Sequence, residues 1–329
     1  MSPGATQSGP PPIPDHGLIR RIAVGSYGSI WLARNVFGAF RAVKLVRRRT
    51  FKSARQYERE FEGVRQFEPI SRSHPGFVQI LHVGRNDAEG HFYYVMELAD
   101  DLQHRRQIQP ASYQPRTLRA ELDRRRRLPL DECLLLGQTL LLALEELHAR
   151  GLVHRDLKPA NLIYVDGVPK LADIGTVATA GHKDTPVGSI GYNPPEGSGR
   201  PAADVFSFGR VLYEMFSGVH VQELADALPD LRPRLKDERQ RKFYDILQAA
   251  TQANPSRRLP SARSLREALS ALLPVHDVNA GRKDAPRPAV TDPIAPTVVE
   301  ESPYGAVPPD SPSYVRREAD ATLEAAWAR

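Results

Sequence analysis

The sequence predicts a mixed α+β protein made of two lobes, and three observations lead to this prediction. The first is length, because 329 residues are enough for two packed lobes and a tail. The second is a strand-rich pattern of β-branched and apolar runs from His16 to about Leu98. The third is the change to longer apolar segments of helical character beyond that point. We therefore expect a small β-rich lobe followed by a larger helical lobe.

Composition and cysteine content favour a globular protein of a reducing compartment. Hydrophobic residues make up 41% of the chain and charged residues 26%, which is typical of soluble domains. Cys133 is the single cysteine, which excludes an intrachain disulfide and predicts a cytoplasmic location. It opens a leucine-rich segment, so a place in the core explains it better than a reactive thiol.

The sequence predicts neither a secretion signal nor a membrane span. Residues 1–15 are rich in Pro, Gly and Ser and lack the basic and apolar regions of a signal peptide, which predicts a flexible leader. The most apolar run, 134–147, is interrupted by polar residues and shorter than the roughly 20 residues that a membrane span needs. It therefore predicts a buried helix, and we expect no membrane partner.

The net charge of +6 is modest, and its densest cluster is the run Arg124–Arg127. Such a run can be the solvated end of a helix or a docking site for acidic or nucleic-acid partners. No aromatic residues are interleaved with it, so we expect no nucleic-acid partner.

Local patterns place the elements of the first lobe. Two apolar runs flank Gly25–Gly28 and predict a hairpin between Leu18 and Leu32. A second apolar run, 41–46, carries one lysine, Lys44. Residues 53–67 have apolar residues at helical spacing, 68–73 are expected to be a small insertion, and 92–98 form a further strand.

In the second lobe, residues 131–150 are predicted to form a helix that starts at Asp131 and stops before Gly151. A hairpin is expected across Asp166-Gly167, and a buried helix from Asp204 to Phe216. The polar stretch 100–117 is expected to be a surface loop, with a role in substrate access as the alternative.

The stretch with the clearest chemistry is His154–Asn161, with the sequence His-Arg-Asp-Leu-Lys-Pro-Ala-Asn. It places a carboxylate, an ammonium and a carboxamide on one short loop, and phosphoryl transfer needs a proton acceptor, a cation and a metal ligand. The alternative is a polar turn between apolar stretches. At these residues the sequence resembles the catalytic loop of serine/threonine protein kinases, and the style of the motifs is similar to the bacterial members of that family.

The resemblance implies a two-lobed protein kinase fold, with one regulatory helix in the β-rich N-lobe and a helical C-lobe. It implies that Asp156 accepts the proton of the attacking hydroxyl and that Lys158 neutralises charge on the γ-phosphate. Asn161 and Asp173 would hold Mg²⁺, while Lys44 would position ATP and Glu60 would orient Lys44.

The nucleotide contacts follow from the same resemblance. Ala23-x-Gly25-x-x-Gly28 is similar to the kinase glycine-rich loop, with alanine at the first position, and it would cover the phosphates with backbone N–H groups. Residues 92–99 resemble the last N-lobe strand and the hinge that binds adenine. The implied ATP contacts are Ala23, Val24, Gly25, Ser26, Gly28, Ile30, Ala42, Lys44, Met96, Glu97, Ala99 and Ile163.

The segment after the catalytic loop carries the features that bear on regulation and acceptor choice. Asp173-Ile174-Gly175 matches the Asp-Phe-Gly motif with isoleucine for phenylalanine. Ser189, in a stretch similar to the end of the kinase activation segment, implies a serine or threonine acceptor. Phosphate on Thr185 would reach Arg155, although Thr185 can equally begin a Thr-Pro turn.

Three further residues would have structural roles in a kinase. The resemblance implies that Asp204 tethers the catalytic loop, and that Arg258 pairs with Glu196.

The resemblance covers about Leu18–Leu273, so we expect a kinase domain over 16–275, with the N-lobe at 16–98 and the C-lobe at 99–275. Residues 276–329 are Pro-rich and predict a disordered tail with a short terminal helix and a possible partner. The implied cofactors are ATP and Mg²⁺, and the implied substrates are proteins. Two alternatives remain: a pseudokinase scaffold, suggested by Ala23, Ile174 and Pro195, and a small-molecule kinase.

Overall fold

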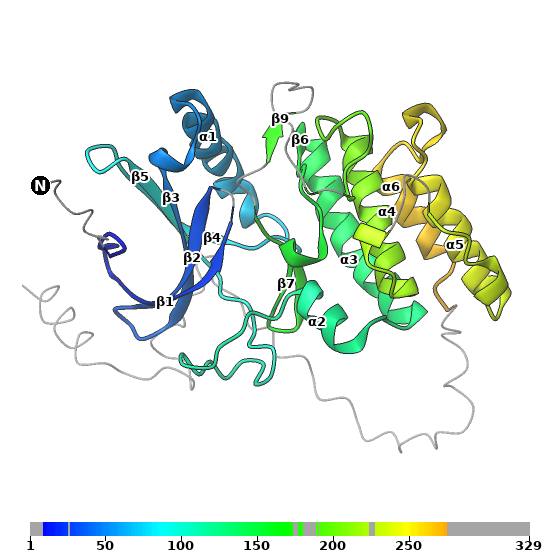
Figure 1. Ribbon diagram of the computed structural model, residues 1–329, viewed down its shortest axis with the longest axis horizontal. Coiled ribbons are helices and arrows are strands. Elements are labelled where there is room, and N and C mark those ends of the chain that lie inside the picture. The colour runs from blue at the N-terminus through cyan, green and yellow to red at the C-terminus, as the bar shows by residue number, and fades with distance from the viewer. Residues whose placement is uncertain are drawn as a thin grey trace, which may run out of the picture. The chain divides into compact units, whose positions relative to one another are not determined.

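A computed structural model of the chain shows two lobes joined by a single connection (Figure 1). The expectations for Ser26, Ile174, Thr185 and the tail 276–329 lie outside the residues that the structure describes. The described residues are 9–25, 27–173, 177–179, 189, 191–223 and 228–274.

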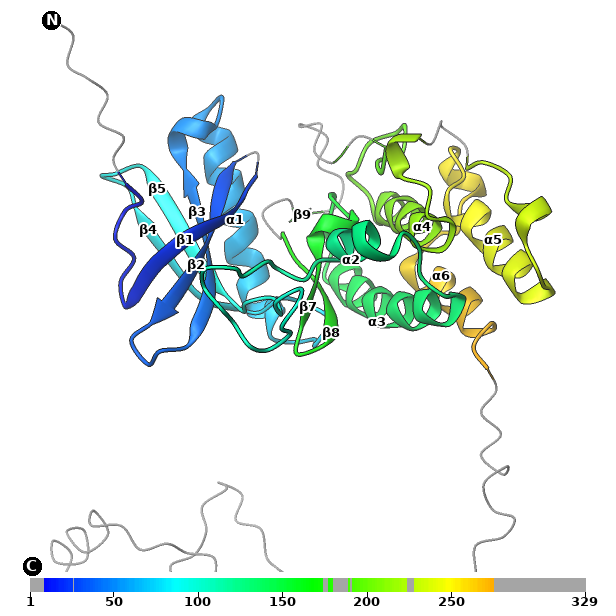
Figure 2. The same ribbon diagram turned by 60° about the horizontal axis from the view of Figure 1, so that its bottom comes forward.

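The N-lobe is an antiparallel sheet with strand order β1-β2-β3-β5-β4, and helix α1 lies beside it (Figure 2). The predicted hairpin around 25–28 is confirmed as the β1–β2 pair, and the strand that carries Lys44 is β3, in the middle of the sheet. The elements are β1 His16–Val24, β2 Gly28–Asn35, β3 Phe40–Arg47, α1 Ala54–Ser71, β4 Ile80–Asn86 and β5 His91–Met96.

Both faces of this sheet are covered, which follows from side chains alternating along β3 and β5. Val46 and Tyr94 face the main core with α1, whereas Val43 and Val95 face the opposite side. Ile13 closes that opposite side and is only 5% exposed. A residue of the predicted leader therefore packs on the sheet.

Helix α1 differs from the prediction at its C-terminal end. Ser53 caps its N-terminus by accepting a hydrogen bond from the Gln56 N–H. The helix then continues through Pro69 to Ser71, four residues beyond the predicted end at Phe67, and takes in part of the expected insertion 68–73. A proline in a helix removes a backbone hydrogen bond, but the burial of Phe67 and Ile70 on this last turn favours the helical course.

The C-lobe is built around α4, whose residues from Ala203 to Met215 are all buried. This confirms the predicted buried helix, and Gly218 ends it with a left-handed φ of 74°. Helix α3 begins at Leu130, one residue before the predicted start. The elements are α2 Leu118–Arg125, α3 Leu130–Ala149, β6 Leu152–Val153, β7 Leu162–Val165, β8 Val168–Leu171, β9 Ala178–Thr179, α4 Pro201–Ser217, α5 Glu238–Ala250 and α6 Ala262–Ser270.

The connection between the lobes is an ordered surface loop. The Asp101 carboxylate accepts hydrogen bonds from the backbone N–H groups of Gln103, His104 and Gln114, at 2.7 to 3.0 Å. Arg20 of β1 donates to the Pro110 carbonyl at 2.7 Å. Residues 100–117 are therefore fixed by a buried carboxylate and fastened to the N-lobe.

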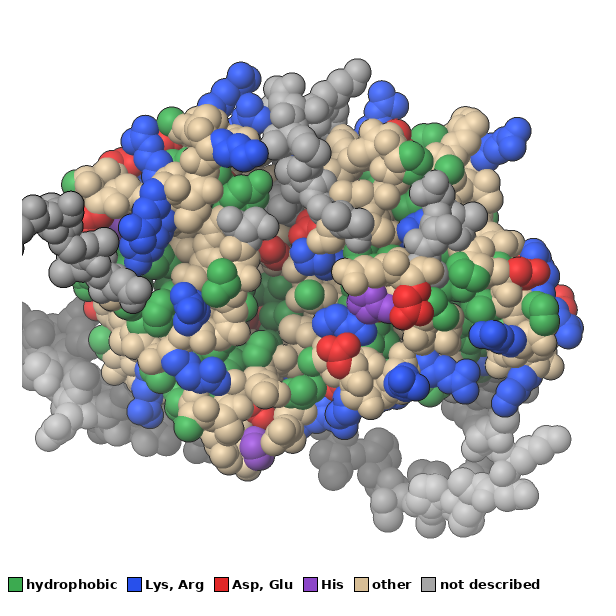
Figure 3. Space-filling view, in the orientation of Figure 1, with side chains coloured by type: hydrophobic (Ala, Val, Ile, Leu, Met, Phe, Trp, Pro, Cys, Tyr) green, Lys and Arg blue, Asp and Glu red, His purple; other side chains and the backbone are tan. Residues whose placement is uncertain are grey.

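No helix in the described part of the chain is long and apolar enough to cross a membrane. On the face drawn in Figure 3, Lys and Arg side chains are scattered over both lobes and are more frequent than acidic side chains. Cys133 is buried, as predicted, and burial raises the pKa of its thiol.

Candidate active site

The loop between β6 and β7 brings together the polar groups that the sequence singled out. The Asp156 carboxylate accepts hydrogen bonds from Lys158 Nζ at 2.7 Å, Asn161 Nδ2 at 3.0 Å and the Ser189 hydroxyl at 2.9 Å. Lys158 Nζ also donates to Ser189 Oγ at 2.7 Å. A cation, an amide and a hydroxyl thus fix the orientation of one carboxylate.

The loop is anchored from below by Asp204 of α4. Its carboxylate accepts hydrogen bonds from the backbone N–H groups of His154 at 2.8 Å and Arg155 at 2.9 Å, and it contacts His148 Nε2 at 2.8 Å. Arg155 has a φ of 72°, which is rare for a residue with a side chain. Burial alone would raise the pKa of Asp204, but the interactions with His148 and His154 hold it below its usual value. The charged form of Asp204 therefore holds a strained turn in place.

Lys44 and Asp173 form the contact that joins the lobes at this site. Lys44 Nζ lies 2.5 Å from Asp173 Oδ1, and the Lys44 side chain is 8% exposed. Burial would lower the pKa of Lys44, but the charges of Asp173, Tyr94 and Glu60 outweigh it and raise the pKa well above its usual value. Burial would likewise raise the pKa of Asp173, and Lys44 keeps it low. Both groups are therefore charged at neutral pH.

Glu60 of α1, expected to pair with Lys44, lies near this pair without joining it. Among the described residues, Asp173 is the carboxylate within ion-pair distance of Lys44. Glu60 is 8% exposed, and its burial raises its pKa to about 7 despite the attraction of Lys44. Asp173 already neutralises the lysine and itself adds to the raised pKa of Glu60, so the charged form of this buried acid is disfavoured.

This shift predicts a pH dependence of stability that Glu60→Gln removes. An acid whose pKa rises on folding stabilises the protein fully below its unfolded pKa and loses that contribution as pH rises through the folded value. Relative to Glu60→Gln, the wild type should lose on the order of 2–3 kcal/mol between pH 5 and pH 8. Urea unfolding at both pH values measures this. Glu62→Gln, at a half-exposed site on the same helix, should run parallel to the wild type, and equal curves for all three proteins would contradict the prediction.

Contacts within the protein itself determine the shape of the loop between β1 and β2 at its two glycines. The Gly25 N–H donates to the Gly28 carbonyl at 2.8 Å, which closes the turn. A Cβ added to Gly28 would lie 2.5 Å from the Leu45 carbonyl oxygen, so glycine is required there by β3 itself. Ala23 pairs with Ile30, and Val24 at the tip is 70% exposed.

The connection after β5 offers unused backbone groups. Neither the Glu97 carbonyl nor the Ala99 N–H bonds to another described residue. The Glu97 side chain is instead occupied by Lys170 Nζ, at 2.7 and 2.9 Å. Ala42 pairs with Met96 across β3 and β5, and Ile30 and Ile163 are partly buried against the same hydrophobic core.

An ion pair between the buried Arg258 and the partly exposed Glu196 fixes the segment that follows Ser189. Arg258, whose side chain is 0% exposed, donates to Glu196 Oε1 at 2.6 Å and to Oε2 at 3.1 Å. Its remaining donors bond the carbonyls of Ala202, Gln252 and Ala253. The guanidinium therefore connects three separate points of the C-lobe, at Glu196, Ala202 and Gln252-Ala253.

Several residues of the site were missed from the sequence. His148 supports Asp204, and His154 Nε2 lies 3.1 Å from the Ala172 carbonyl, next to Asp173. The Tyr192 hydroxyl donates to the buried Glu214, which also pairs with Arg119. The one local signal was the position of His154 inside the motif His154–Asn161; nothing in the sequence connects His148, Tyr192 or Glu214 to their partners.

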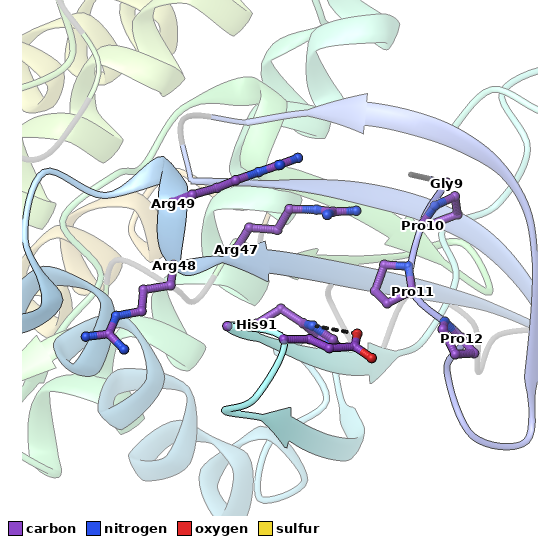
Figure 4. A pocket seen from close by; sticks show the side chains of 10 residues that line it. Gly9, Pro10, Pro11, Pro12, Arg47, Arg48, Arg49 and His91 are labelled. Carbon is purple, nitrogen blue, oxygen red and sulfur yellow. Dashed lines mark ion pairs between the residues drawn. The ribbon is translucent and has the colours of Figure 1, made fainter. Parts of the chain in front are cut away.

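A separate cavity of about 830 Å³ lies on the N-lobe, away from the catalytic loop (Figure 4). Arg47 and Arg49 extend side by side toward the segment Pro10–Pro12, and Arg48 points elsewhere. His91 Nδ1 lies 3.6 Å from a Glu89 carboxylate oxygen. The lining of this cavity includes none of the residues that surround Asp156, so the cavity is not the phosphoryl-transfer site.

Three features together define the active site of a kinase. They are an oriented carboxylate beside a lysine, a second carboxylate paired with a lysine across two lobes, and a hinge with unpaired backbone groups among the described residues. Comparison with known proteins agrees. Residues 17–272 match the family described as "Protein kinase domain". The chain therefore belongs to the protein kinase family and has its α+β, two-lobed fold.

Three of the relatives are named as serine/threonine-protein kinases, or probable ones, of bacteria. Serine/threonine-protein kinase PknA of Mycobacterium tuberculosis is 30% identical, over 89% of this chain and 67% of that protein. Probable serine/threonine-protein kinase CPE1738 of Clostridium perfringens is 26% identical, over 75% of this chain and 37% of that protein. Probable serine/threonine-protein kinase PknB of Lactococcus lactis is 27% identical, over 61% of this chain and 31% of that protein. The chain is thus similar to bacterial serine/threonine protein kinases, which are ATP-binding transferases that act on proteins.

Proposed function

We propose that this kinase transfers the γ-phosphoryl group of ATP to serine or threonine hydroxyls of protein substrates, with Asp156 as the proton acceptor. The observation that carries the proposal is the triple support of Asp156 by Lys158, Asn161 and Ser189. A carboxylate held in this way meets the incoming hydroxyl without reorganisation. Lys158 is placed to offset charge on the phosphate, and the Ser189 hydroxyl supports a serine or threonine acceptor.

The residues present fit a magnesium ion with ATP. Asn161 uses its Nδ2 to hold Asp156, which leaves its Oδ1 without a hydrogen bond from another described residue. That oxygen and the Asp173 carboxylate are the hard ligands that Mg²⁺ prefers. When bound, the ion supplies neutralisation of phosphate charge. We propose that Lys44 holds the α and β phosphates, that Glu60 orients Lys44 through its nearby charge without a direct ion pair, and that Gly25 and Gly28 leave room for the phosphates.

The adenine site is proposed at the hinge. The unused Glu97 carbonyl and Ala99 N–H match a base edge that has one donor and one acceptor. Ile30 and Ala42 would cover the ring from one side and Ile163 from the other, with Met96 as the gatekeeper.

Three further proposals concern regulation, cellular location and the tail. We propose that phosphate on Thr185 is bound by Arg155, which adjoins the catalytic aspartate. We also propose a cytoplasmic location, supported by the single buried cysteine, and a partner for the tail 276–329. Mass spectrometry of the purified protein would show whether Thr185 is phosphorylated, and an unmodified residue in active enzyme would contradict its role.

Asp156→Asn tests the enzyme proposal against a pseudokinase scaffold. Transfer from labelled ATP should fall at least about a hundredfold, because the base is lost while its shape is kept. Nucleotide affinity should stay within a few-fold, because Asp156 is not proposed as an ATP ligand. Equal transfer by the variant and the wild type would reject the mechanism. Parallel assays with protein and small-molecule acceptors separate this proposal from a small-molecule kinase.

A further inference from the structure

A cationic pocket on the C-lobe lies outside the active site, and it includes one end of the basic run Arg124–Arg127. The pocket has a volume of about 580 Å³ and is formed where the α2–α3 connection meets the end of α4 and the start of α5. The Leu128 N–H donates to the Met215 carbonyl at 2.7 Å, which fixes the connection against α4. It shares no residue with the catalytic loop.

The four arginines of the basic run do not have the same role. Arg124 pairs with Glu121 at 2.8 Å, and Arg125 pairs with Glu132 through both of its terminal nitrogens. Arg127 is exposed, lines the pocket, and forms no ion pair with another described residue. The first two arginines therefore stabilise the helix ends, whereas Arg127 belongs to a surface.

Two further cations share the pocket with Arg127. Arg234 and Lys236 are exposed, line the same pocket, and form no side-chain hydrogen bond or ion pair within the described part of the chain. The carboxylates that line it are already engaged, since Asp131 pairs with Arg239 at 2.5 Å and Asp237 caps α5 by accepting from the Gln240 N–H. The positive charges that line the pocket therefore outnumber the negative ones, and three of them have no ion-pair partner among the described residues.

The floor of the pocket is apolar. Leu128 and Leu231 are buried there, and Phe216 and Leu235 are half-buried beside them. The pocket volume of about 580 Å³ lies within the range of about 300–1,000 Å³ that small-ligand pockets span. The pocket is therefore large enough for one or two apolar side chains. A rim of cations around an apolar floor matches a ligand in which carboxylates flank a bulky apolar side chain.

We propose that this pocket docks an acidic segment of a protein substrate, one that carries leucine-like side chains between carboxylates. The proposal rests on the proposed function, because it names a feature of the proteins that this kinase phosphorylates. Docking away from the catalytic loop raises the local concentration of the acceptor hydroxyl and lowers KM without a change in kcat.

The first test measures binding alone. The probe is a short fluorescein-labelled peptide with paired leucines flanked by glutamates, and anisotropy is read with the full chain and no ATP. A variant with Arg127→Gln, Arg234→Gln and Lys236→Gln should bind about tenfold more weakly, since exposed charge pairs each contribute roughly 0.2–1 kcal/mol. Added salt should weaken binding to the wild type.

The matched control removes the same charge elsewhere on the C-lobe, by Arg241→Gln, Lys242→Gln and Arg263→Gln at exposed sites outside the pocket. This variant should bind like the wild type. Equal loss in both variants would reduce the effect to net charge and overturn the proposal, as would the absence of binding. A change in oligomeric state on light scattering in the pocket variant alone would assign the surface to a second copy and also overturn it.

The second test separates this proposal from the proposed function. Transfer is measured to an acceptor peptide with and without the acidic segment. The segment should lower KM about tenfold for the wild type and not for the pocket variant, while kcat and transfer to the plain acceptor stay equal in both. If the wild type transferred phosphate to neither acceptor, the proposed function would be rejected. If it transferred phosphate to both with the same KM, only the docking proposal would be rejected.

Discussion

Replacing Asp173 by asparagine should lower kcat for phosphoryl transfer by about a thousandfold at saturating ATP and magnesium. Two effects add. The variant loses a proposed ligand of Mg²⁺, and Lys44 loses the carboxylate 2.5 Å away that neutralises it in a buried site. The neutral amide keeps the shape of the side chain, so the fold should survive. Steady-state transfer from labelled ATP, with melting temperature as a check on folding, measures the effect.

Asp166→Asn is the matched control. Asp166 and Asp173 have similar left-handed φ values of 52° and 56°, which asparagine tolerates well. Asp166, however, pairs with Arg106 at a site where its side chain is 64% exposed. Its substitution should leave kcat unchanged. If Asp173→Asn kept more than about a tenth of the wild-type rate, the proposed role of Asp173 would be rejected.

The elements of the fold were predictable because they follow from local patterns. The hairpin at Gly25–Gly28, the β7–β8 hairpin across Asp166-Gly167 and the buried helix α4 each come from periodicity and turn residues within a short window. The misplaced end of α1 shows the limit of this reasoning. The apolar spacing read from the sequence stops at Phe67, but the helix runs on to Ser71, where Phe67 and Ile70 are buried by residues far away in the sequence.

The partners within the site were less predictable than its members. The resemblance named Asp156, Lys158 and Asn161, and the structure brings them together. It did not name His148 as a support of Asp204, because 56 residues separate the two. Nor could the sequence decide whether Lys44 pairs with Asp173 or Glu60. That choice depends on burial and distance across two lobes, which no single-chain pattern encodes.

The contacts of the buried Arg258 give the largest expected effect on stability. Arg258→Met should lower the free energy of unfolding by about 3–5 kcal/mol, because the removed guanidinium is fully buried and each buried acceptor that it leaves unpaired costs roughly 1–3 kcal/mol. The carbonyls of Ala202, Gln252 and Ala253 also lose their donor. Urea unfolding measures the change, and Arg257→Met, at the exposed neighbour, should stay within about 0.5 kcal/mol of the wild type.

A double-variant cycle assigns this loss to its cause. Glu196 is 30% exposed, so its carboxylate can be partly hydrated once the arginine is gone. Adding Glu196→Gln to Arg258→Met should therefore recover only part of the stability, on the order of 1 kcal/mol, because the buried carbonyls remain without donors. Full recovery would show that the charge pair alone carries the effect, and no recovery would show that the carbonyl contacts do. A loss below about 1 kcal/mol in Arg258→Met itself would contradict the structural role proposed for the pair.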